Sequence, residues 1–209
     1  MARLSRSRKL PNMDPQAKRQ TCWGMADALM ADYHDSEWGV PCRDDAELFE
    51  RLMLEGFQAG LSWSTILNKR ENFREAFEGW DAKRIAEYSE KDLERLMADP
   101  GIVRNRLKVA GAVRNARAFL DVQAEHGTFA NYIWSFVDGA TLQRPAPVSF
   151  KDVPAKTPES DAMSRALQKR GFTFVGSTIC YAFMQSVGMV NDHIADCPAR
   201  NPRQLGLIP

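Results

Sequence analysis

Residues 89–124 read SEKDLERLMADPGIVRNRLKVAGAVRNARAFLDVQA, and this stretch decides the fold. Apolar residues recur every three or four positions on both sides of Asp99-Pro100-Gly101, which is the spacing of amphipathic helices. Ser89 and Asp92 resemble a capping box, with Asp in place of the usual Glu, and Pro-Gly is a typical helix stop. The stretch therefore predicts a helix from near Ser89 to Ala98, a tight turn over 99–102, and a long helix from Val103 to about Ala124.

Helical spacing also dominates the chain outside this stretch. It predicts helices over about 44–57, after Ser62, and from about Ser160 to Lys169-Arg170-Gly171. The apolar run 172–190 contains Gly, Ser, Thr and Cys, which favours a tightly packed buried helix over a membrane span. Residues 140–160 are rich in Pro and polar side chains and predict a loop without a regular element. No pair of alternating strands is present, so we expect an all-α fold.

Composition fits one large or two-lobed globular domain. The chain has 209 residues, of which 44% are hydrophobic and 26% charged, which excludes disordered, collagenous and disulfide-scaffold classes. Four widely spread cysteines do not indicate a disulfide framework. The N-terminus lacks the apolar core of a secretory signal, so we expect a soluble, cytoplasmic protein. A short organellar transit peptide stays open, although Pro11 and Pro15 would interrupt its amphipathic helix.

The formal net charge of +1 is the sum of a basic N-terminal segment and a net acidic remainder. Residues 1–21 carry six basic side chains and one acidic one, whereas the remainder of the chain is net acidic. Within that remainder, residues 100–118 contain no acid and five basic residues: Arg104, Arg106, Lys108, Arg114 and Arg117. These clusters are either solvated surface or contacts for nucleic acid, and charge alone does not decide between the two. We expect a basic, disordered tail over 1–21, a helical domain over 22–198 and a C-terminal tail over 199–209.

Two Cys/His pairs form a candidate metal set. His193 and Cys197 are four residues apart, and Cys22 and His34 are separated by eleven residues. Together they make a Cys2His2 set, which suits tetrahedral zinc. Neither pair has zinc-finger spacing, so the spacing alone also allows ordinary thiols and polar histidines.

Five longer blocks identify a family. They are YHDSEWGVP at 33–41, LEGFQAGLSW at 54–63, KRENF at 69–73, KRGFTFVGSTICY at 169–181 and VNDH at 190–193. These blocks closely resemble the bacterial DNA-3-methyladenine glycosylase I family, and the resemblance runs from about Cys22 to Cys197.

The resemblance implies a two-lobed helix-hairpin-helix glycosylase fold. One structural zinc per chain is implied on Cys22, His34, His193 and Cys197, where it would join the N- and C-terminal segments. The implied activity is base-excision repair: the enzyme extracts 3-methyladenine from alkylated double-stranded DNA, hydrolyses its N-glycosidic bond, and leaves an abasic site and free 3-methyladenine. A cytoplasmic monomer, associated with the nucleoid through DNA and without contact to membranes, is expected.

Site residues follow from the same blocks. By resemblance Glu55 is the catalytic carboxylate that accepts hydrogen bonds from the damaged adenine, and Tyr33, Trp38 and Trp63 are walls of the base pocket. From the residues alone, core packing of the aromatic side chains and a surface helix position for Glu55 stay open. Leu61, in the loop Ala59-Gly60-Leu61, is expected to fill the gap left by the extracted base, unless it is buried in the core.

The turn after residue 98 is the expected contact with the DNA backbone. Amides near Gly101 are expected to bind a phosphate, with Arg104, Arg106 and Lys108 supplying positive charge. Asp121 falls where the wider superfamily commonly has a catalytic Asp, but this family dispenses with that carboxylate. We therefore interpret Asp121 as a helix-end residue.

Three departures from the family pattern bear on substrate range. Trp23 follows Cys22 directly, Met30 stands where an aromatic residue is common, and Phe57 stands where Gln is common. The alternatives are a glycosylase for another alkylated base and a non-catalytic, zinc-stapled module that binds damaged DNA. A zinc-dependent hydrolase is disfavoured, because four protein ligands leave no open metal position.

Overall fold

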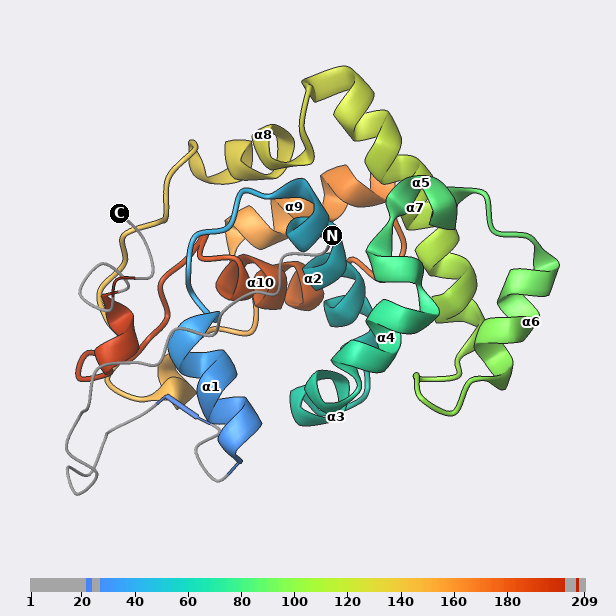
Figure 1. Ribbon diagram of the computed structural model, residues 1–209. Helices are drawn as coiled ribbons and strands as arrows, with labels where there is room; N and C mark the ends of the chain where they lie inside the picture. Colours follow the sequence, from blue (N-terminus) through green and yellow to red (C-terminus); the bar gives the residue numbers. More distant parts are fainter. Residues whose placement is uncertain (1–21, 24–26, 202–205, 207–209) are drawn as a thin grey trace.

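The computed structural model describes residues 22–23, 27–201 and 206, and within these ranges it contains helices and no strands (Figure 1). The all-α prediction is confirmed for this part of the chain. The α-helices are α1 (Ala28–Ser36), α2 (Asp45–Gln58), α3 (Trp63–Asn68), α4 (Arg70–Ala76), α5 (Ala82–Ala86), α6 (Glu90–Ala98), α7 (Arg106–His126), α8 (Phe129–Trp134), α9 (Pro158–Lys169) and α10 (Ser177–Ser186). Short 3-10 helices are η1 (Glu78–Trp80), η2 (Ser135–Val137), η3 (Phe150–Asp152) and η4 (Pro198–Arg200).

Helix α2 is the centre of the core. Its residues Leu48, Phe49 and Leu52 are fully buried, and the helix packs against α10, α7 and α8 (Figure 1). Burial of this apolar stripe is the main stabilising contribution that the sequence pattern predicts. Because α2 is fixed on several sides, side chains at its C-terminal end have a well-defined position.

A second, smaller apolar cluster lies where the N- and C-terminal parts of the chain meet. It contains Tyr33 and Trp38 together with Ile194 and Ala199. The C-terminal tail expected from residue 199 begins within η4, where Ala199 is buried and the Arg200 guanidinium donates to the carbonyl of His193. The tail expected over 1–21 lies outside the described residues.

The helices α6 and α7 form the two arms around the turn that the sequence predicts. The capping box is present, because the Asp92 carboxylate accepts a 2.8 Å hydrogen bond from the Ser89 backbone N–H. Helix α7 begins at Arg106 rather than at Val103. The reason is Asn105, whose side chain caps the helix by accepting from the Lys108 backbone N–H.

Two other expectations need correction. The buried helix expected over 172–190 is shortened to α10, because Phe174 before it and Gly188 after it have φ angles of 58° and 71°, which break the helical path. The segment expected to lack regular structure contains η3, in which Ser149 and Asp152 form a capping box. Within the described ranges, no helix combines the length and the apolar character needed to cross a bilayer.

Candidate functional site

A cavity of about 210 Å³ opens beside the C-terminal half of α2. Five separate segments contribute to it. The first is the stretch before α1, the second is α1 with the residues after it, and the third is α2 together with α3. The fourth is η3 and the fifth is α10. The lining residues are Trp23, Met30, Tyr33, Trp38, Glu55, Gln58, Trp63, Phe150, Ala182 and Gln185. The volume is below the roughly 300–1,000 Å³ typical of sites for drug-sized ligands and suits a smaller, flat molecule.

Glu55 is the carboxylate of the cavity. Its side chain is 3% exposed, and its Oε2 atom has no hydrogen-bond partner among the described residues. Burial raises the pKa of Glu55 to about 8, and the positive charge of Arg51, one turn earlier on α2, acts in the opposite direction. The Arg51 guanidinium is itself held by the carbonyl of Ser186 at 2.6 Å. The cavity therefore contains a buried carboxyl oxygen without a hydrogen-bond partner among the described residues.

Aromatic rings surround this carboxylate. The ring centroids of Tyr33 and Trp63 are 5.2 Å apart, and those of Trp23 and Trp38 are 5.3 Å apart. The buried Nε1 atom of Trp63 also has no hydrogen-bond partner within the described part of the chain. Flat π faces around a carboxylate suit a planar, electron-poor ligand that carries a hydrogen-bond donor.

The structure brings four predicted residues together, since Glu55, Tyr33, Trp38 and Trp63 all line this cavity. Two of the three departures, Trp23 and Met30, line it as well. The third does not line it, because Phe57 is 2% exposed and packs on Phe73 with ring centroids 4.7 Å apart.

Sequence reasoning missed four lining residues. These are Gln58, Phe150, Ala182 and Gln185. Gln58 is in a recognised block and only three residues after Glu55, so its spacing on one helical face was an available signal. Phe150 carries no local signal, because it lies in a segment that the sequence predicts to be an irregular loop.

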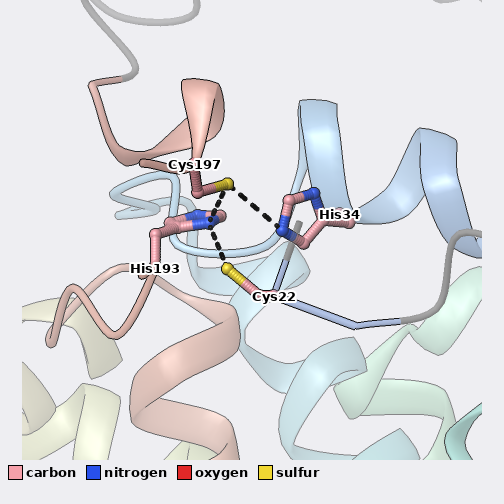
Figure 2. A group of neighbouring side chains, drawn as sticks. All are labelled: Cys22, His34, His193 and Cys197. Carbon is pink, nitrogen blue, oxygen red and sulfur yellow. Dashed lines mark hydrogen bonds between the residues drawn. The ribbon is translucent and has the colours of Figure 1, made fainter. Parts of the chain in front are cut away.

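The four Cys/His residues form a compact buried cluster beside the cavity (Figure 2). Their candidate ligand atoms all lie within 4.8 Å of one another. The sulfur of Cys197 is 3.6 Å from Nε2 of His34 and 3.4 Å from Nδ1 of His193, and the sulfur of Cys22 is 3.5 Å from the same Nδ1. The cluster joins a segment before α1, α1 itself, and the segment after α10.

The outer nitrogens of both histidines are fixed by acceptors. His34 donates from Nδ1 to the Asp35 carboxylate at 2.8 Å, and His193 donates from Nε2 to the carbonyl of Trp38 at 3.1 Å. In a neutral imidazole that holds its proton on the outer nitrogen, the inner nitrogen offers its lone pair on the side of the sulfurs. A hydrogen bond from the Cys22 thiol lowers the pKa of the Cys197 thiol. This group of four is suited to binding a metal ion.

The loop between α2 and α3 carries an exposed apolar side chain. Leu61 is 42% exposed, so the alternative that it is a core residue is excluded. Gly60 has a φ of 83°, a conformation that favours glycine, and Ser62 caps α3 by accepting from the Thr65 backbone N–H. Leu61 therefore lies on a short loop that is fixed at both ends.

The turn between α6 and α7 differs from the expected phosphate site. The Gly101 amide donates to the Asp99 carboxylate at 2.7 Å and therefore has an anionic partner within the turn. Lys108 is 7% exposed, and its Nζ donates to the carbonyls of Phe57 at 2.9 Å and Ala59 at 2.6 Å. Arg104 is exposed, as expected. The expectation that Lys108 is a surface DNA contact is therefore corrected, because its ammonium has partners within the protein, whereas the role expected for Gly101 stays a prediction.

Arg106 and Asp121 are both exposed residues of α7. Arg106 is exposed but forms an ion pair with Glu90 of α6, which links the two helices. Asp121 lies on the exposed side of α7, five residues before the helix ends, and does not line the cavity.

Comparison with known proteins gives consistent results. The family model for methyladenine glycosylases matches residues 23–201. The chain is 47% identical to a DNA-3-methyladenine glycosylase of Haemophilus influenzae, over 85% of this chain and 96% of that protein. It is 48% identical to DNA-3-methyladenine glycosylase 1 of Escherichia coli, over 84% and 93%.

Solved structures agree with these sequence relatives. A crystal structure of a 3-methyladenine DNA glycosylase I superposes with a TM-score of 0.83 at 51% identity, covering 86% of this chain and 98% of that one. The Staphylococcus aureus 3-methyladenine DNA glycosylase I, studied for its recognition of 3-methyladenine, superposes with a TM-score of 0.81 at 34% identity, covering 86% and 95%.

Proposed function

Because the chain belongs to the methyladenine glycosylase family, we propose that it hydrolyses the N-glycosidic bond of 3-methyladenine in alkylated double-stranded DNA, with the cavity at Glu55 as its base pocket. One observation carries the assignment of the pocket. Glu55 is buried among aromatic rings, and its Oε2 lacks a partner among the described residues. Such an atom is costly in a folded protein unless a ligand supplies the missing hydrogen bond.

Charge explains how the pocket selects its substrate. Adenine methylated at N3 is cationic while it is bonded to the sugar, whereas unmodified adenine is neutral. The aromatic faces attract a cation, and the Glu55 carboxylate accepts a hydrogen bond from the exocyclic amino group. A cation in the pocket also lowers the pKa of Glu55 and therefore favours the ionised form of this acceptor.

The same charge makes the base a good leaving group. The bond between C1′ and N9 breaks, both electrons go to the base, and the base leaves as neutral 3-methyladenine. The sugar passes through an oxocarbenium-like state, a water oxygen adds to C1′, and a proton is released to solvent. Glu55 holds the extracted base in the orientation that leads to cleavage, and no strong general base is required.

DNA contacts are assigned to two exposed features. Leu61 fills the space that the extracted base leaves in the duplex, because it is an exposed apolar side chain on a loop that directly follows the pocket helix. Arg104 and Arg106 supply positive charge to the backbone from the turn before α7.

We assign one structural zinc ion to Cys22, His34, His193 and Cys197. Around a tetrahedral zinc, ligand atoms are separated by about 3.3–3.8 Å, given the usual Zn–S and Zn–N bond lengths. Three of the sulfur-to-nitrogen distances, at 3.4–3.6 Å, fit this range. Four protein ligands leave no position for water, so the ion would stabilise the fold without taking part in bond cleavage.

The direct test is to identify the base that the purified protein releases from methylated duplex DNA. We expect chromatography to show free 3-methyladenine as the main product, with abasic sites left in the strand. Release of a different alkylated base would favour a glycosylase with another substrate. Binding of methylated DNA without release of any base would favour a non-catalytic module. Either result would contradict the proposal.

A further inference from the structure

One wall of the cavity comes from the long segment between η2 and α9, which contains no recognised sequence block. Phe150 lies at the start of η3, in the segment that connects η2 to α9. Its ring centroid is 6.4 Å from that of Trp23 and 6.1 Å from that of Trp38, and both pairs are T-shaped. The residue is 37% exposed, so its ring lies at the rim of the cavity rather than in the core.

Local hydrogen bonds fix the turn that carries Phe150. The Asp152 carboxylate accepts from the Ser149 backbone N–H at 2.8 Å, and the Ser149 hydroxyl accepts from the Lys151 backbone N–H at 3.2 Å. These contacts close a capped 3-10 turn around Phe150. The backbone position of Phe150 is therefore held by a capped turn.

Longer-range contacts attach the same segment to the end of the chain. The carbonyl of Pro147, three residues before Phe150, accepts from the Ala195 backbone N–H at 3.1 Å, and Leu142 N–H donates to the carbonyl of Met189 at 2.9 Å. Arg144 pairs with Glu159 at the start of α9 at 2.7 Å. Ala195 lies between His193 and Cys197, so the Phe150 segment is anchored next to the cluster of four Cys/His residues.

We propose that Phe150 is a specificity-determining residue of the base pocket, whose ring closes the side formed by Trp23 and Trp38 and contacts the cationic alkylated purine. This inference rests on the proposed function. A partly exposed ring loses solvent contact when a planar base enters, which favours binding. An aromatic side chain at this place also adds a π surface that attracts a cation more than a neutral purine.

Two substitutions separate the shape of Phe150 from its aromatic character. Phe150→Ala removes the wall, whereas Phe150→Leu keeps most of the apolar volume and removes the π face. Val148→Ala is the matched control, because Val148 lies in the same segment, is 82% exposed and does not line the cavity.

Binding is measured by tryptophan fluorescence with two small probes. One is 3,9-dimethyladeninium, which keeps the positive charge of a methylated base bonded through N9, and the other is the neutral 9-methyladenine. We expect Phe150→Ala to weaken binding of the cation about tenfold, as is typical when an aromatic stacking partner of a base is removed. We expect Phe150→Leu to weaken it about threefold and to reduce the preference for the cation over the neutral probe.

The outcomes distinguish this inference from the proposed function. If the wild-type chain binds the cation and both Phe150 variants bind it as tightly as Val148→Ala, the inference is overturned and the proposed function stands. If the wild-type chain does not bind the cation, the proposed function and the role of Phe150 both fail. If Phe150→Ala does not fold, the comparison of Phe150→Leu with Val148→Ala decides.

Discussion

The cavity at Glu55 and the turn between α6 and α7 are built in opposite ways. The cavity collects side chains from five separate segments and leaves a buried carboxylate oxygen without a partner among the described residues. The turn comes from one continuous stretch, and its polar groups are largely satisfied within the protein. The contrast indicates that the cavity is prepared for a ligand, whereas much of the turn holds the two helices in place.

Glu55 and Lys108 show this contrast most clearly, because both are charged residues with little exposure. The Lys108 ammonium has two carbonyl partners at the C-terminal end of α2, where positive charge is favourable. Glu55 has Arg51 as a compensating charge and no hydrogen bond to Oε2 from the described residues. Lys108 therefore stabilises the joint between α7 and α2, and Glu55 remains available to a substrate.

The largest effect on stability is expected at the Cys/His cluster of Cys22, His34, His193 and Cys197. Cys197→Ala should abolish stoichiometric zinc binding and lower the free energy of unfolding by several kcal/mol, because the metal joins distant segments. Metal content and urea denaturation measure this, with Cys180→Ala, outside the cluster, as the control that keeps its zinc. Unchanged stability on removal of the metal would contradict a structural role.

The next effect concerns the pH dependence of stability. The pKa of Glu55 is about 8 in the folded protein, above its ordinary value of 4.5. The folded state therefore holds this proton more tightly, and the associated stability is complete below about pH 4.5 and is lost as the pH rises through 8. Relative to Glu55→Gln, the wild-type protein should lose about 2–4 kcal/mol between pH 5 and pH 9. Parallel curves for the two proteins would show that Glu55 ionises normally.

Lys108→Met tests the claim that Lys108 stabilises the contact between α7 and α2. The substitution removes the donor to two carbonyls, and we expect a loss of about 2 kcal/mol in the free energy of unfolding. The salt dependence of DNA binding should stay as in the wild-type protein. The opposite result, normal stability with a smaller salt slope, would return Lys108 to the DNA interface.

The smallest effect is expected for Arg104→Gln. Arg104 is exposed beside the turn, and loss of one phosphate contact should reduce the salt slope of DNA binding by about 1 without changing stability. Arg165→Gln, an exposed residue on α9, is the matched control and should leave the slope unchanged. Equal slopes for both variants would exclude Arg104 from the interface.

These differences show which features local sequence signals can predict. The start of α6 follows from Ser89 and Asp92, which are three residues apart and bond directly to each other. The start of α7 was predicted three residues too early, because apolar periodicity continues through Val103 and does not reveal that Asn105 is the cap. Local patterns therefore predict helices well and their ends less well.

Tertiary contacts determine most of the features that local sequence signals do not predict. The aromatic pocket residues and Glu55 were identified by family resemblance, and the structure places them around one cavity. Phe150 was missed because its position depends on contacts such as Pro147 to Ala195, which are far apart in sequence. Lys108 was misplaced because a basic residue on an amphipathic helix gives no sign that two carbonyls lie within its reach.

The most direct test of the central claim compares wild type and Glu55→Gln in single-turnover release of 3-methyladenine from methylated duplex DNA. Glu71→Gln, with a side chain that is 74% exposed on α4, is the control. We predict that Glu55→Gln lowers the rate about 100-fold or more while DNA binding persists, and that Glu71→Gln releases the base at the wild-type rate. A Glu55→Gln rate equal to that of the wild type would contradict the assignment of this cavity as the base pocket.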